Sequence, residues 1–209
     1  MKITRVTCCL FILLLSLVAF AFTTNVTKAH AASGNTIVFK GHGLHVESGF
    51  DYINGSIETT VYVDAFQNKV HNQIVSTADV FIGQVDLLTN KTIMDASGGT
   101  SSLAFQIDKT LLSASLSAIM PVFDNQTGQK LFDVTVNMTW TSTSDIYHQN
   151  FTQHYHTQGF TINSHSNADI RDATASGTVF DGTTNYTPYP SMFAQIVSAK
   201  SVQVTITRN

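Results

Sequence analysis

The chain has 209 residues, of which 43% are hydrophobic and only 12% are charged, and its formal net charge is −3. Residues 1–31 contain three basic residues, Lys2, Arg5 and Lys28, and no acidic residue. Residues 32–209 therefore contain 8 basic and 14 acidic residues and have a net charge of about −6. A negative chain without a run of Lys or Arg excludes nucleic acid and anionic membrane surfaces as expected partners.

Residues 1–31 predict an export signal. A short basic start precedes the apolar run Cys8–Phe22, and the tripeptide Ala-His-Ala at 29–31 matches the small-x-small pattern that a signal peptidase cuts. The alternative is a retained membrane anchor, but a helix that crosses a bilayer needs roughly 20 apolar residues, more than this run provides. We expect a secretory signal peptide that is cleaved after Ala31, a single domain over 32–209 without a stable membrane anchor, and a secreted, extracellular protein.

Both cysteines, Cys8 and Cys9, lie within this predicted signal. The domain 32–209 therefore has no disulfide, no thiolate metal ligand and no cysteine nucleophile. It has to be stabilised by its hydrophobic core alone.

Most of the chain after residue 32 alternates apolar and polar residues with period two, and no segment shows a sustained helical period. The clearest strand is 132–140, in which Phe132 and Trp140 begin and end the apolar set; 112–122 and 202–206 alternate in the same way. Such strands have one buried face and one face in water. The sequence therefore predicts an all-β domain.

Turn residues separate these runs. Asn54-Gly55 and Asp181-Gly182 are two-residue turn signals, 124–128 (DNQTG) is a longer one, and 97–102 and 188–191 are expected to be loops. Roughly ten to twelve short antiparallel strands are typical of a two-layer β-sandwich. We expect a jelly-roll or Greek-key sandwich rather than a sheet closed on itself.

The segment 147–171 carries the one cluster that could support chemistry. If Gln158-Gly159 is a two-residue turn, the register pairs apolar residues on a face that we expect to be buried, with Tyr155 opposite Ile162 and Tyr147 opposite Ile170. On the other face the same register predicts these polar pairs: His156 with Thr161, His154 with Asn163, Thr152 with His165, and His148 with Asp169. A slip of one residue would place histidines in the core, which supports this register.

Histidines on a rigid strand are good ligands for zinc or copper. The candidate metal ligands are His148, His154, His156, His165 and Asp169. The alternative to a metal site is a polar sheet face that is simply solvated. The open face and the absence of an acidic residue placed as a general base favour that alternative. A cut after Ala29 would instead expose His30 as an N-terminal copper ligand, together with a second histidine.

Other chemistry is sparse. Tyr186 and Tyr189, beside two prolines, could stack on a sugar ring, and packing within a loop is the alternative. Glu47 and Glu58 are the only glutamates, and nothing in the sequence pairs them for glycoside hydrolysis. The motifs of serine hydrolases, phosphate-binding loops and zinc proteases are absent from the sequence.

These patterns favour a non-catalytic extracellular module that binds a glycan, a cell-wall polymer or a protein. The alternative is a metal-dependent extracellular enzyme or metal-binding protein that uses zinc or copper on the histidine-rich face. A structural component of a surface or spore coat is a third class. Convergence of the histidines in a concavity would favour the metal alternative, and a flat arrangement would favour the binding module.

Overall fold

The computed structural model describes residues 36–70, 73–157, 160–188 and 191–208, and the strands in these ranges pair antiparallel. No helix occurs in these ranges. The prediction of an all-β antiparallel fold is confirmed. The strands are β1 (Thr36–Asn54), β2 (Ile57–Val70), β3 (Gln73–Asp86), β4 (Lys91–Thr100), β5 (Leu103–Ile107), β6 (Ser113–Asp124), β7 (Lys130–Ser142), β8 (Tyr147–Thr157), β9 (Phe160–Phe180), β10 (Asn185–Tyr186) and β11 (Ser191–Arg208).

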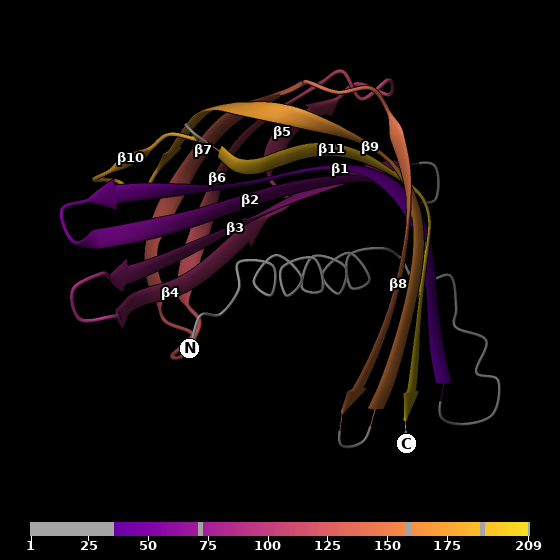
Figure 1. Cartoon of the computed structure of the whole chain (residues 1–209), viewed down its shortest axis with the longest axis horizontal. Coiled ribbons are helices and arrows are strands. Elements are labelled where there is room, and N and C mark those ends of the chain that lie inside the picture. The colour runs from indigo at the N-terminus through magenta and orange to yellow at the C-terminus, as the bar shows by residue number, and fades with distance from the viewer. Residues whose placement is uncertain (1–35, 71–72, 158–159, 189–190, 209) are drawn as a thin grey trace.

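Strand β9 joins the two sides of the sheet, because its two halves pair with different strands. Its first part, 160–172, pairs with β11, and its second part, 173–180, pairs with β7. From β11 the pairing continues through β1, β2, β3, β4 and β6 back to β7. The pairing therefore returns to its starting strand, and the strands form one continuous, curved sheet that closes on itself (Figure 1). The preference for two separate layers of jelly-roll or Greek-key type is not confirmed by this pairing and stays a prediction.

The period-two alternation places one face of most strands of this sheet in a shared core. Buried side chains from β1 to β4 pack with those from β6, β7, β9 and β11 in one cluster. Trp140 is fully buried, and its Nε1 donates a hydrogen bond to the backbone oxygen of Glu47 at 3.3 Å, which links β7 to β1 across the core. The burial of Trp140 that the alternation predicts is confirmed.

The chain turns at Asp124 and at Asp181 as predicted, but the second turn spans residues 181–184 instead of two residues, because Phe180 pairs with Asn185. Each aspartate accepts hydrogen bonds on Oδ1 from backbone amides two and three residues further on. Gly128 and Gly182 in the same loops have positive φ angles of 70° and 95°. These aspartates thus have the local structural role that Asp commonly has in turns.

Two turn predictions need correction. The β1–β2 turn consists of Gly55 and Ser56, because Asn54 still pairs with Ile57, so the turn lies one residue later than predicted. The predicted loop at 97–102 is wrong, since β4 continues to Thr100. Gly98 is needed there because a Cβ atom would lie 2.1 Å from the backbone oxygen of Pro121 in β6, so this glycine marks a close strand approach. The predicted loop at 188–191 lies partly outside the described residues.

Four strand segments project from the rest of the sheet and are called the arm here. They are β8, residues 160–167 of β9, residues 201–208 of β11 and residues 36–41 of β1, which pair in this order. Register shifts between Ala199 and Ser201 in β11 and between Gly41 and Gly43 in β1 mark a bulge at its base. A bulge bends a strand, and Figure 1 shows the arm turning away from the sheet at this level.

Replacing Trp140 by Ala is expected to lower the free energy of unfolding by about 3 to 5 kcal/mol, because the ring fills the centre of the core. Urea unfolding of the parent and the variant measures this difference. Thr141→Ala, at the exposed neighbouring position, is the control and should change stability by less than about 0.5 kcal/mol. A Trp140→Ala variant as stable as the parent would contradict the core assignment.

Candidate functional site

One face of the arm carries the polar cluster that the sequence predicts. The β8–β9 register pairs His156 with Thr161, His154 with Asn163, Thr152 with His165 and His148 with Asp169, which confirms the predicted register. The predicted turn residues Gln158 and Gly159 lie outside the described residues. The four histidines are exposed, so this face presents an array of imidazole, amide and hydroxyl groups to solvent. The expectation that the opposite, apolar face is buried is wrong for Tyr155, which is 45% exposed, whereas Ile170 is buried.

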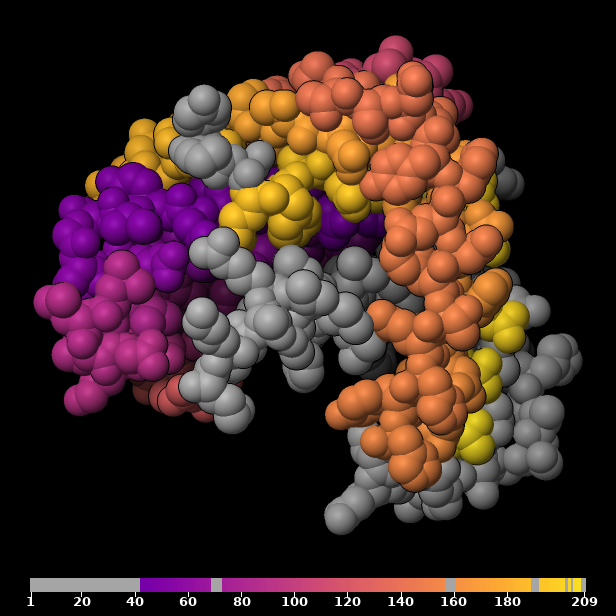
Figure 2. Space-filling view, viewed as in Figure 1, coloured from indigo at the N-terminus to yellow at the C-terminus, as the bar shows by residue number. Residues whose placement is uncertain are grey.

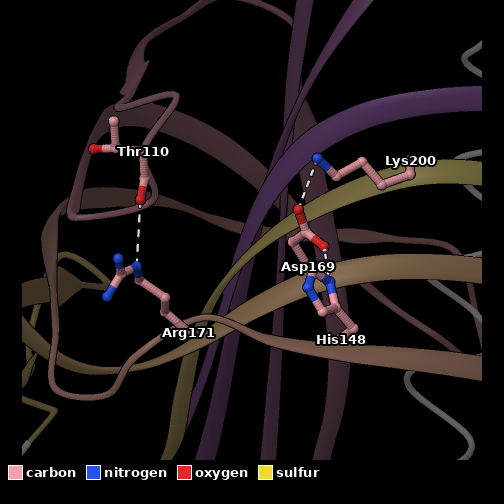
Figure 3. Close-up of polar contacts among 5 residues, drawn as sticks. All are labelled: Thr110, His148, Asp169, Arg171 and Lys200. Atoms are coloured by element: carbon pink, nitrogen blue, oxygen red, sulfur yellow. Dashed lines mark hydrogen bonds and ion pairs between the residues drawn. The ribbon is translucent and has the colours of Figure 1, made fainter.

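Asp169 is the most constrained member of this face. Its Oδ1 is hydrogen-bonded to His148 Nδ1, and its Oδ2 accepts a bond from Lys200 Nζ at 2.7 Å (Figure 3). Lys200, and after it His148, lower the pKa of this carboxyl group. A carboxylate held by two donors is a poor general base, because its proton affinity is reduced.

Arg171 follows two residues after Asp169 but serves a structural contact. Its Nε donates to the backbone oxygen of Thr110 at 3.3 Å (Figure 3). One terminal nitrogen donates to the backbone oxygen of Ser144 at 2.6 Å. These bonds tie β9 to the loop before β6 and to the loop before β8. Arg171 is therefore committed to fixing the base of the arm.

The other histidines of the face bind their own cross-strand neighbours. His154 Nδ1 is hydrogen-bonded to Asn163 Oδ1, His156 Nδ1 lies 2.9 Å from Thr161 Oγ1, and His165 Nδ1 lies 3.1 Å from Thr152 Oγ1. Within the ranges that the structure describes, no group of three or more His, Cys, Asp or Glu side chains is arranged to hold a metal ion. Each histidine is bonded to its own cross-strand neighbour, and zinc or copper binding stays a prediction.

Of the two tyrosines that could stack on a sugar, Tyr186 and Tyr189, the structure describes only Tyr186. Tyr186 is 2% exposed, its hydroxyl donates to Asp181 Oδ2 at 2.7 Å, and its ring packs edge-on against Tyr52 with centroids 5.5 Å apart. Burial beside the Asp181 carboxylate raises the pKa of this phenol. These contacts favour the loop-packing alternative for Tyr186. Tyr189 lies outside the described residues.

A row of three carboxyl groups crosses the sheet on the face opposite the core. Glu47 of β1 pairs with Asp64 of β2, and Asp64 pairs with Asp79 of β3, so the three side chains lie directly opposite one another. The alternation within a single strand does not reveal this row, because each of its residues belongs to a different strand. Combining the registers of two successive hairpins, β1–β2 and β2–β3, would have revealed it.

Aromatic side chains flank the acidic row on both sides. The rings of Phe81 and Phe193 lie 5.9 and 6.0 Å from that of Tyr62, and the rings of His45 and Phe66 are 5.4 Å apart. Along the strands, Tyr62, Phe81 and Phe193 lie two residues from the acidic row on one side. His45 and Phe66 lie two residues from it on the other side. The carboxyl groups therefore lie in apolar surroundings, which disfavour their charged forms.

The pKa values of these acids reflect their surroundings. Burial raises the pKa of Glu47 from 4.5 to about 7. Burial and then the charges of Glu47 and Asp79 raise that of Asp64, and burial raises that of Asp79. Burial also lowers the pKa of His45 to about 4, so this imidazole is neutral near pH 7 and does not neutralise the row.

The acidic row should make stability depend on pH. Glu47 binds its proton more tightly in the folded chain, so its stabilising contribution is complete below about pH 4.5 and is lost as the pH rises through about 7. His45 acts oppositely between about pH 4 and 6.5, which makes the comparison with a variant necessary. Relative to the parent, Glu47→Gln should gain on the order of 2 to 3 kcal/mol between pH 5 and pH 8.

Urea midpoints of the parent and Glu47→Gln at the two pH values measure this gain. Asp133→Asn removes an acid from an exposed position of β7 beside Lys130 and serves as the control. An effect of Glu47→Gln that is the same at both pH values would show that the row is not proton-linked.

Comparisons with known proteins provide no relative for this chain. No family model, no curated protein and no solved structure matches it. Among the residues that the structure describes, no helix has the length and apolar character needed to span a membrane. The functional argument therefore depends on the geometry of the arm and of the acidic row.

Proposed function

We propose that the protein is a secreted, non-catalytic, all-β module that binds an extracellular glycan or cell-wall polymer through the polar face of its arm. The observation that carries this proposal is the exposed array of His, Asn and Thr side chains on β8 and β9. Secretion rests on the predicted signal at 1–31, which lies outside the described residues.

The array suits a polyhydroxylated ligand because its groups repeat at regular spacing. Side chains on one face of a sheet recur about every 6.8 Å along a strand and about 4.8 Å across strands. Asn163, His165 and Asn167 form such a series on β9, and all three are exposed. Amide and hydroxyl groups both donate and accept hydrogen bonds, as sugar hydroxyls require.

A non-catalytic role is supported by the bonding of the titratable groups. Each histidine of the face uses Nδ1 to bind a neighbour on the adjacent strand, and Asp169 is held between His148 and Lys200. A general acid–base pair needs two titratable groups that face a common reacting atom. The hydrogen bonds of the face instead connect each titratable group to its own cross-strand partner.

Asn163→Ala combined with Asn167→Ala should weaken glycan binding at least about tenfold, because two exposed amide groups are lost from the array. A glycan array followed by co-sedimentation with insoluble cell-wall polymer measures binding. Asn137→Ala, an exposed amide on β7 outside the arm, is the control. Unchanged binding by the double variant would exclude this face as the glycan-binding site. If the parent protein binds a protein and no glycan, the ligand is a protein partner instead.

A second candidate function is binding of zinc or copper, and one observation favours it. His154 and His165 are diagonal neighbours, and each binds a cross-strand partner through Nδ1, which leaves Nε2 as the nitrogen for a metal ion. Metal-binding histidines commonly have their other nitrogen fixed in this way. This candidate includes a metal-dependent enzyme as the alternative to a binding module.

If His154 and His165 share one metal ion, His154→Ala and His165→Ala should weaken zinc binding non-additively, so that the double variant loses little more than either single variant. Titration calorimetry with zinc, supported by native mass spectrometry of the secreted protein, measures the affinity and the bound metal. His42→Ala, at an exposed position of β1, is the matched control. Additive losses, or none, would indicate separate surface histidines.

A further inference from the structure

Strand β8 forms an open edge of the arm. In the part of the chain that the structure describes, β8 pairs with β9 on one side only. An open edge presents backbone N–H and C=O groups that can pair with another strand. Figure 2 shows the orange residues of this strand along the surface of the arm.

The sequence of β8 lacks the features that usually protect such an edge. Natural edge strands carry Lys, Pro, inward-pointing charges or bulges that prevent pairing with other chains. Between Tyr147 and Thr157 there is no Lys, Arg, Asp, Glu, Pro or Gly. The pairing with β9 is continuous from Tyr147 to Thr157, so no bulge interrupts the strand either.

The residues of this edge are arranged almost as a palindrome. The segment 147–155 reads YHQNFTQHY, with Phe151 at its centre. Outward from Phe151, Asn and Thr occupy the first pair of positions, Gln the second, His the third and Tyr the fourth. An antiparallel pair of identical strands related by a two-fold axis brings such positions opposite one another.

We propose that two copies of the chain form a dimer by antiparallel pairing of β8 with β8, about a two-fold axis through Phe151. The resulting pairs are Phe151 with Phe151, Asn150 with Thr152, Gln149 with Gln153, His148 with His154, and Tyr147 with Tyr155. Odd residues meet odd residues and even residues meet even ones, so the polar face of one arm continues into the polar face of the other. The proposal does not depend on the glycan-binding function.

Side-chain pairing distinguishes this register from the neighbouring one. The Phe151-centred register places three aromatic pairs on one face, and aromatic cross-strand pairs stabilise a sheet. A register centred on Thr152 would put Phe151 opposite Gln153 and Tyr155 opposite Gln149, and all the aromatic pairs would be lost. The Phe151-centred pairing joins two four-stranded arms into one eight-stranded sheet, larger than the few strands that a stable sheet needs.

Lysines at the centre of the edge should break the dimer. Asn150→Lys with Thr152→Lys places like charges opposite each other across the axis, and both positions are exposed in the single chain. Sedimentation equilibrium should show the dissociation constant rise by at least about tenfold. Ser117→Lys with Ile119→Lys is the control, because these exposed residues have the same spacing on β6, which pairs on both sides.

Disulfide trapping tests the register. In a Cys8→Ser/Cys9→Ser background, Phe151→Cys should give a disulfide-linked dimer under mild oxidation, because residue 151 meets its own copy. Gln149→Cys, on the same strand and face, should stay unlinked. Three results would overturn the proposal: a chain that is monomeric at roughly 100 μM, a dimer unaffected by the β8 lysines, or equal crosslinking at 149 and 151.

Discussion

The double pairing of β9 is the constraint on which the rest of the structure depends. One uninterrupted strand contributes to the arm through its pairing with β11 and β8, and to the core through its pairing with β7. The approach to β7 requires Gly177, which has φ of 123° and where a Cβ atom would lie 2.1 Å from the backbone oxygen of Asn137. Because side chains alternate along a strand, a shift in β9 would exchange the faces of both the arm and the core.

Strand pairings within a single hairpin can be predicted from the sequence. Pairings within a hairpin follow from a short turn and from matching apolar faces, so the β8–β9 register could be predicted. The closure of the sheet and the bulge at the base of the arm depend on pairings between segments far apart in the chain, such as β1 with β11. No local pattern specifies those pairings. Gly98 shows the same limit, since a glycine that suggests a loop in sequence proves to serve a strand contact.

The candidate site was predictable to the same extent. The histidine face lies within one hairpin and was predicted residue by residue, whereas the acidic row of Glu47, Asp64 and Asp79 spans three strands and was not. Tyr186 illustrates a further difficulty, because a tyrosine between turn residues and prolines looks exposed in sequence. Its hydroxyl can be buried only because Asp181 accepts its hydrogen bond, and that partner becomes evident only in the fold.

The pairing of β1 with β11 also determines how the molecule would respond to force. Thr36 lies opposite Thr207, so both ends of the described strands are at the tip of the arm, away from the core. A load applied between these ends would peel β1 from β11 one hydrogen bond at a time, starting at the tip, instead of shearing all the bonds together. The force would reach the core only after β1 had separated from β11 as far as the bulge at the base of the arm. The arm would therefore unfold first and protect the core from low forces.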